Sequence, residues 1–219
     1  MDAKTTAEFR HWFQREIVPA NYSPAFHVFV NFGILISACV FCLSRLDNVT
    51  FADLLVFPAT LLLGNFVEFF VHKELLHKLN WVSAETYKIH SKWHHRYFTD
   101  DAIEYDSAKD IFMVFFPKAV LVAFGCAFLP LAYWALSRIL TNNQTFLLLL
   151  GATTYFLLYE SIHYICHMRE TSPIFRIGLF RFLREHHRTH HRLGLMHGYN
   201  FNIVFPVADK VFGKIHSSG

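Results

Sequence analysis

Four long apolar stretches constrain this chain more than any other feature of its sequence. They run over about residues 25–43, 54–71, 111–136 and 145–166. A helix of roughly 20 mostly apolar residues crosses the core of a bilayer, and each stretch approaches or meets that length. The alternative is a soluble bundle of buried helices, but such helices should each show a polar face, and these barely do. The sequence therefore predicts an all-α integral membrane protein with four transmembrane helices.

The basic residues predict the side of the membrane on which the connecting segments lie. Four crossings place the N-terminus and the segments 72–110 and 167–219 on one side, and that side holds most of the 20 Lys and Arg residues. By the positive-inside rule this side is cytoplasmic. The basic residues form no stripe interleaved with polar surface, so a nucleic-acid partner is not expected. We expect a single membrane domain, 1–219, with its four spans within 25–166.

The segment before the first span, residues 1–24, has helical spacing of its apolar side chains. Phe9, Trp12 and Phe13 recur at this spacing, and charged residues occupy the other positions. This pattern predicts either a helix that lies in the membrane interface or a helix that packs against the rest of the chain. The remaining polar parts, the insert 72–110 and the tail 167–219, are expected to form a cytoplasmic helical cap rich in histidine.

Histidine is heavily over-used, and most of it falls in two windows. Of the 15 histidines, twelve lie within residues 72–95 and 163–197. A lone histidine is usually structural, but so many at repeated spacings indicate a metal site, since neutral imidazole suits zinc, copper, iron and nickel. The histidines in these spacings exceed what one ion needs, so two ions are implied.

The spacings of these histidines predict which of them lie on the same face of a helix. Three groups contain an i,i+4 pair, which places both rings on one face of a helix; these are His163 with His167, His90 with His94 beside His95, and His187 with His191 beside His190. His72 and His77 are five apart, about 140° around an ideal helix. These two need a bulge, or a helix end between them, in order to meet.

Neutral imidazole ligands bring no negative charge, so nearby acids are expected to orient the rings through their second nitrogen. Glu160 and Asp100 are candidates for this role. Glu160 is the stronger one, because it lies on an apolar helix one turn before His163, where an ionisable group is costly without a partner.

Two other metal functions compete with this interpretation. Glu74-x-x-His77 and Glu160-x-x-His163 match the Glu-x-x-His motif of soluble di-iron carboxylate bundles, but that pattern explains only two histidines and expects a soluble protein. A membrane metal-binding or transport protein would need polar ligands near the middle of its spans. Most of the histidines lie outside the spans, which disfavours transport.

The motifs, taken in order, resemble those of the fatty acid hydroxylase superfamily, membrane enzymes that include sterol desaturases and ceramide fatty-acid hydroxylases. The resemblance covers about residues 54–215 and rests on His72-Lys-Glu-Leu-Leu-His77, Tyr87-Lys-Ile-His90-Ser-Lys-Trp-His94-His95, Tyr159-Glu-Ser-Ile-His163-Tyr-Ile-Cys-His167, His186-His187-Arg-Thr-His190-His191 and the closing segment from Asn200 to Gly213. By this resemblance the metal ligands are His72, His77, His90, His94, His95, His163, His167, His187, His190 and His191. His187 is preferred to His186, and His197, which has no position in the motifs, either lines the site or lies on the surface.

The resemblance implies a centre of two iron ions that activates O2; purified relatives can carry zinc in its place. The expected reaction inserts one oxygen atom into a C–H bond of an acyl, sterol or isoprenoid lipid that enters from the bilayer, and a desaturase would use the same motifs. The chain has no nicotinamide, flavin or haem motif, so a separate electron-donor protein is expected to dock on the basic cytoplasmic face. The membrane is either the bacterial inner membrane or the endoplasmic reticulum.

Overall fold

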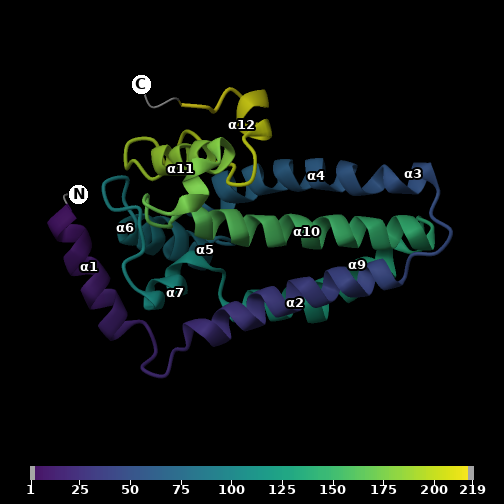
Figure 1. Ribbon diagram of the computed structural model, residues 1–219, viewed down its shortest axis with the longest axis horizontal. Coiled ribbons are helices and arrows are strands. Elements are labelled where there is room, and N and C mark those ends of the chain that lie inside the picture. Colours follow the sequence, from purple (N-terminus) through teal and green to yellow (C-terminus); the bar gives the residue numbers. More distant parts are fainter. Residues whose placement is uncertain (1–2, 217–219) are drawn as a thin grey trace. The chain divides into compact units, whose positions relative to one another are not determined.

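The computed structural model describes residues 3–216, and every regular element within this range is helical (Figure 1). Four helical stretches are long and apolar enough to cross a membrane, which confirms the predicted all-α fold with four spans. They are α2 (Pro24–Ser44), the run Phe51–Leu76 formed by α3 (Phe51–Leu54), α4 (Val56–Phe70) and η1 (Val71–Leu76), the run Lys118–Leu136 formed by α8 (Lys118–Ala123), η4 (Phe124–Phe128) and α9 (Leu129–Leu136), and α10 (Asn142–Cys166).

The other helices are shorter and lie in the segments that flank the spans. They are α1 (Ala3–Glu16), α5 (Ala84–Tyr87), η2 (Lys88–His94), α6 (His95–Tyr97), η3 (Ala108–Asp110), α7 (Ile111–Val114), η5 (Pro173–Arg176), α11 (Gly178–His190) and α12 (Val207–Val211). Three of the elements marked η, namely η1, η2 and η4, are π-helical. Two of these π-helices, η1 and η2, contain predicted metal ligands.

The chain divides into two compact units. The first, called the histidine unit below, comprises Met1–Pro24, Asn65–Phe115 and Ser161–Gly219. The second, called the span unit, comprises Ala25–Gly64 and Phe116–Glu160. Every predicted metal ligand belongs to the histidine unit.

The third span begins later than its hydropathy predicts. Residues 111–114 form the separate helix α7, and Phe115 is extended, with φ −87° and ψ 153°. Pro117 accounts for the interruption, because it has no N–H to continue the helix and its ring disfavours a helical conformation in Phe116, the residue before it. The apolar helix therefore starts at Lys118, and the expected start at residue 111 is wrong.

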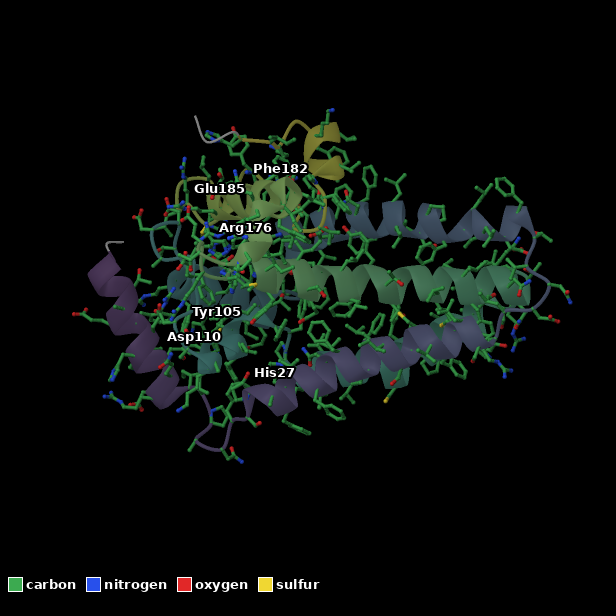
Figure 2. The ribbon with its side chains drawn as sticks, viewed as in Figure 1. His27, Tyr105, Asp110, Arg176, Phe182 and Glu185 are labelled. Atoms are coloured by element: carbon green, nitrogen blue, oxygen red, sulfur yellow. The ribbon has the colours of Figure 1, made fainter. Side chains whose placement is uncertain are left out.

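Side chains of the span unit satisfy the backbone at this break. His27 Nε2 and Asn31 Nδ2 on α2 both donate to the Phe116 carbonyl, each at 2.9 Å; His27 is labelled in Figure 2. The Phe116 N–H donates to Glu160 Oε1 on α10 at 3.1 Å. Backbone groups in a membrane need such partners because no water is there to replace them.

Two glycines allow close helix packing in the span unit. A Cβ atom on Gly151 would lie 2.7 Å from Thr60 Cβ, and one on Gly64 would lie 2.7 Å from Tyr155 Cγ. Small residues at such positions let helix backbones approach each other in a membrane. A Cβ atom on Gly33 of α2, in contrast, would meet no other described element within 4 Å.

In the histidine unit, α1 packs through two of its aromatic side chains. Phe13 is fully buried and Phe9 nearly so, and Phe13 meets the Tyr97 ring edge-on at 5.5 Å between centroids. Arg10 donates to the Tyr97 carbonyl at 2.7 Å and pairs with Asp106 at 2.6 Å. Phe9 and Phe13 thus follow the second of the two alternatives drawn from the sequence, a helix packed against the rest of its unit.

The glycines give a matched test of the packing. Gly151→Ala should lower the melting temperature of the detergent-solubilised protein, because overpacking at a contact this tight costs about 1–3 kcal/mol. Gly33→Ala should leave it unchanged or raise it, since alanine in an open helical position is favoured over glycine by about 1 kcal/mol. If Gly151→Ala and Gly33→Ala melt alike, the close approach at Gly151 is not present in solution.

Candidate metal centre

A π-helical turn brings together the two histidines of the first motif. The His77 N–H donates to the His72 carbonyl, five residues back, at 3.1 Å. Hydrogen bonds of this i to i+5 type define a π-bulge, in which residues five apart come onto one face. The bulge that the spacing of His72 and His77 requires is therefore supplied by η1.

The second motif also contains a π-helical turn, in η2. The His95 N–H donates to the His90 carbonyl at the end of η2, and the Nε2 atoms of His90 and His95 lie 3.2 Å apart, while the His94 ring stacks beside that of His90 at 5.1 Å between centroids. The i,i+4 residues His90 and His94 thus keep their rings side by side, but the cluster of potential ligands that contains His90 includes His95 and not His94. The pair partner of His90 is His95, because the local helix is π and not α.

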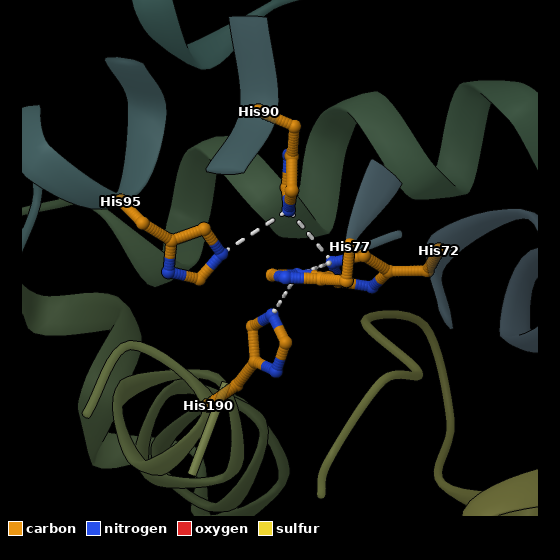
Figure 3. A group of neighbouring side chains, drawn as sticks. All are labelled: His72, His77, His90, His95 and His190. Carbon is orange, nitrogen blue, oxygen red and sulfur yellow. Dashed lines mark hydrogen bonds between the residues drawn. The ribbon is translucent and has the colours of Figure 1, made fainter. Parts of the chain in front are cut away.

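The histidines gather in two groups within the histidine unit. Potential ligand atoms within each group lie within 4.8 Å of one another, and all nine residues are buried. The first group is His72, His77, His90, His95 and His190, and the second group is His94, His163, His167 and His187. Figure 3 shows the rings of the first group converging on one another; they come from η1 and the residue after it, from η2 and α6, and from α11.

Helix α11 contributes to both groups. His187 belongs to the second group and His190 to the first. His191, just after the helix, has its Nε2 3.0 Å from His187 Nε2, and its ring stacks on His95 at 4.3 Å between centroids. Nine of the ten predicted ligands are therefore in the two groups, and the tenth, His191, contacts a member of each.

Main-chain carbonyls fix the rings. In six histidines the Nδ1 atom lies against a carbonyl oxygen, and because a carbonyl can only accept, Nδ1 carries the proton. The pairs are His72 with Phe201, His94 with Met113, His163 with Val114, His167 with Ile103, His190 with Tyr199 and His191 with Phe98. This arrangement leaves each Nε2 with a lone pair and no proton.

The lone pairs then point at one another. His163 and His167 Nε2 are 3.2 Å apart, and neither atom carries a proton to donate. His77 Nε2 is in the same state, because Ser91 Oγ gives its own proton to the Leu76 carbonyl and so accepts from His77 Nδ1. His77 Nε2 nevertheless lies 2.9 Å from His190 Nε2.

Such contacts between unprotonated nitrogens are repulsive unless a cation lies among them. Imidazole nitrogens that bind one ion at about 2.0–2.1 Å lie about 3 Å from each other, which is the separation seen between neighbours in both groups. His94 Nε2, in the second group, is buried and has no protein partner. The donor set and its geometry therefore fit metal ions.

Burial keeps these rings neutral. Removal from water is the largest cause of a lowered pKa for His77, His90 and His95, and neighbouring imidazoles lower the pKa of each further. The pKa of His94 falls to about 4, although its bond to the Met113 carbonyl acts in the opposite direction. The rings are thus uncharged at neutral pH, the state in which imidazole binds a metal.

The two less certain histidines lie outside the groups. His186 is buried, and its Nε2 donates to Asp209 Oδ2 at 3.0 Å. His197 is exposed, with its ring 5.3 Å from that of His77. His186 is therefore committed to a carboxylate, and His197 borders the first group from the surface.

The acids expected to orient the rings make other contacts. Glu160 accepts from the Phe116 N–H in the span unit, and Asp100 faces Arg192 at 3.6 Å. The orienting groups are main-chain carbonyls and the Ser91 hydroxyl. Sequence reasoning missed them because every residue has a carbonyl, so nothing in the residue letters marks those of Tyr199 or Phe201.

The chain belongs to the fatty acid hydroxylase family, whose model matches residues 57–214. The fold is similar to that of the solved structure of full-length Scs7p, in which only the hydroxylase domain is visible, with a TM-score of 0.62 and 16% sequence identity over 89% of this chain and 67% of that one. No curated protein matches the chain in sequence. Family membership and the four apolar helices together make it a multi-pass membrane oxidoreductase.

One histidine from each group gives a test of the site. His163→Ala and His190→Ala should each lower the metal content of the purified protein and abolish its activity, because each removes a converging Nε2 atom. The measurement is total iron and zinc per chain by plasma mass spectrometry. His11→Ala, at an exposed position of α1, is the matched control and should retain full metal; equal metal in all three variants would disprove the site.

The lowered pKa values predict how stability changes with pH. Unfolded histidines bind protons near pH 6.5, whereas the buried rings, such as His94 with a pKa of about 4, stay neutral to lower pH. The unfolded state therefore binds more protons in between, and the free energy of unfolding falls as the pH falls, by up to about 1.4 kcal/mol per pH unit for each such ring. Melting temperatures of the metal-free protein should drop steadily between about pH 6.5 and pH 4; a flat profile contradicts the assignment.

Proposed function

We propose that this protein is an O2-dependent lipid hydroxylase, which inserts one oxygen atom into a C–H bond of an acyl, sterol or isoprenoid substrate at a histidine-ligated centre of two iron ions. The observation that carries the proposal is the pair of buried histidine groups with converging, unprotonated Nε2 atoms. Membership of the fatty acid hydroxylase family supports the reaction class.

In this proposal the first group and the second group each hold one ion, and His191 completes the set between them. The bound iron would supply the redox chemistry that activates O2. The protein holds six of the rings in the Nδ1-protonated form through carbonyls, and His77 through Ser91, so that Nε2 of these rings remains free to bind. It also excludes water, since all nine rings of the two groups are buried.

Neutral ligands also set the charge of the centre. Ten imidazoles leave the full positive charge of two metal ions uncompensated, and the acids Glu160 and Asp100 face other partners. A centre of this kind would keep a net positive charge when the metal is bound. The ligand set is thereby distinct from the Glu-x-x-His type of the soluble bundles.

The substrate and partners follow from the surroundings. Four helices of membrane-spanning length make the bilayer the expected source of an apolar substrate. O2 is the proposed oxidant, and a separate electron-donor protein the proposed reductant. The N-terminus and the metal centre are proposed to lie on the cytoplasmic side, on the strength of the basic residues in 72–110 and 167–219.

Lipid mass spectrometry tests the function. Total lipids from a host expressing the wild type should contain a species with one additional oxygen atom that is missing from cells expressing the His163→Ala, His190→Ala double variant. The double variant is the right comparison because it removes one converging nitrogen from each group. His11→Ala should produce the same lipid as the wild type.

Two other outcomes would change the proposal. A lipid that loses two hydrogen atoms in place of gaining oxygen would make the protein a desaturase with the same ligands. Purified wild-type protein without iron or zinc, together with unchanged lipids, would refute the enzymatic proposal. Feeding candidate lipids and a reductase to iron-loaded protein in nanodiscs separates a missing substrate from a missing activity.

A further inference from the structure

Two separate stretches of backbone orient the two histidine groups. Residues 199–202 present the carbonyls of Tyr199 and Phe201 to His190 and His72, both of the first group. Residues 98–114 present the carbonyls that bind the second group and its neighbour, which are Ile103 to His167, Met113 to His94, Val114 to His163 and Phe98 to His191. Neither stretch can hold its rings unless its own backbone is fixed.

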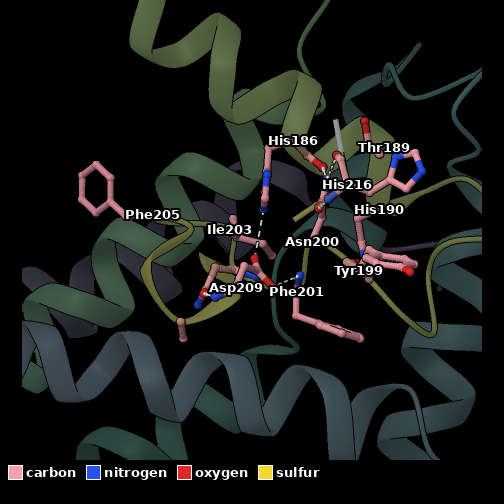
Figure 4. A network of polar contacts seen from close by, with 12 residues as sticks. His186, Thr189, His190, Tyr199, Asn200, Phe201, Ile203, Phe205, Asp209 and His216 are labelled. Carbon is pink, nitrogen blue, oxygen red and sulfur yellow. Dashed lines mark hydrogen bonds and ion pairs between the residues drawn. The ribbon is translucent and has the colours of Figure 1, made fainter. Parts of the chain in front are cut away.

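Asp209 fixes the first stretch. This carboxylate is completely buried on α12. Its Oδ1 accepts from the Phe201 N–H at 2.9 Å and its Oδ2 from the Asn202 N–H at 2.8 Å. His186 Nε2 donates to Oδ2 at 3.0 Å. Asp209 thus binds the backbone N–H groups of Phe201 and Asn202, which lie before and after the Phe201 carbonyl that contacts His72 (Figure 4).

Asn200 also holds this stretch in place, through three hydrogen bonds of its side chain. Its φ of 57° lies in the left-handed region, where asparagine is tolerated better than most residues. Its Nδ2 donates to the carbonyls of His186 and His216, each at 3.1 Å, and its Oδ1 accepts from the His216 N–H at 2.8 Å. The turn that carries Tyr199 and Phe201 is thereby bound to α11 and to the C-terminal segment.

Asp110 is the counterpart in the second stretch. It is also buried, and its Oδ2 accepts from the Asp106 N–H at 2.8 Å and the Ser107 N–H at 2.9 Å. The Tyr97 hydroxyl and Gln14 of α1 donate to its Oδ1. Asp110, labelled in Figure 2, therefore pins the turn between the Ile103 carbonyl and the carbonyls that follow it.

We propose that Asp209 and Asp110 are positioning residues, each of which controls the metal affinity of one histidine group, so that the two metal positions can be emptied independently. Neither acid touches a ring of the two groups; each acts through the backbone that it holds. A buried carboxylate is costly unless hydrogen bonds replace its water. Here backbone N–H groups of the two orienting stretches donate such bonds. The inference rests on the proposed function in requiring that both groups bind metal.

The test uses purified holoprotein and a chelator. Asp209→Asn and Asp110→Asn keep the size of each side chain but replace one acceptor oxygen by a donor. At position 209 that donor faces a backbone N–H in either orientation of the amide, and at position 110 it faces either the backbone N–H groups or the donors Tyr97 and Gln14. Loss of such an orienting group typically weakens metal binding by about 10–100-fold. Iron and zinc retained per chain are measured against rising EDTA. Each variant should release one of its two ions at about 10–100-fold lower EDTA than the wild type and keep the other.

Combined variants identify which ion is lost. Adding His72→Ala to Asp209→Asn should cost no further ion, because both act on the first group, whereas adding His163→Ala should remove the remaining one. Asp110→Asn should behave in the opposite way with the same two partners. A general loss of folding would release both ions alike in every combination, so this crossed pattern separates positioning from mere structural support.

Milder variants cover the case in which an aspartate change prevents folding. Asn200→Gly retains the positive φ but removes the side-chain bonds of the first stretch, and Tyr97→Phe removes only the hydroxyl that donates to Asp110. Each should accelerate the release of one ion to EDTA and leave the other unchanged. Equal effects on both ions, or none, in the aspartate and the milder variants would overturn the inference. Wild-type protein that binds no metal would refute the proposed function itself.

Discussion

The structure depends on one constraint: many imidazoles must be buried close together, neutral and with the same nitrogen free. Burial alone keeps them neutral, but it does not choose between the two nitrogens. Carbonyl acceptors at Nδ1 make that choice for six rings, from His72 to His191. A carbonyl can serve in this way only where the backbone is not using it within a helix. Met113 and Val114 meet this condition because they are the last two residues of α7. The stretches 98–114 and 199–202 are therefore as necessary to the histidine groups as the helices that carry the histidines.

The same need for partners explains the polar residues of the span unit. Pro117 breaks the helical path, and the backbone of Phe116 then requires side chains to replace its lost bonds. His27, Asn31 and Glu160 supply them from α2 and α10. A glutamate that the sequence associates with the metal thus serves the fold of the span unit, three residues before His163. Its position one turn from a ligand is real, but its partner is a peptide group.

The spans and the fold class could be predicted because apolar length is a local property that any 20-residue window displays. The set of clustered histidines could be predicted too, since motif spacing identifies residues that face together. The division of that set could not. His90 and His94 look like partners on an α-helix, yet the π turn in η2 gives His90 to the first group and His94 to the second. Helix type at a single turn depends on packing, which the residue letters do not record.

By itself, the sequence determined the four spans, the α-helical class and the histidines that form the two groups. The length of an apolar run and the spacing of histidines can both be read directly from the order of the residues. Tertiary structure alone decided which histidines lie in the same group, which nitrogen each presents and what holds it. Those decisions are made by carbonyls such as those of Phe98 and Phe201, and by the buried acids Asp110 and Asp209 that fix the backbone around them. Such contacts join segments up to 129 residues apart, as between His72 and Phe201, and only the folded chain brings them together.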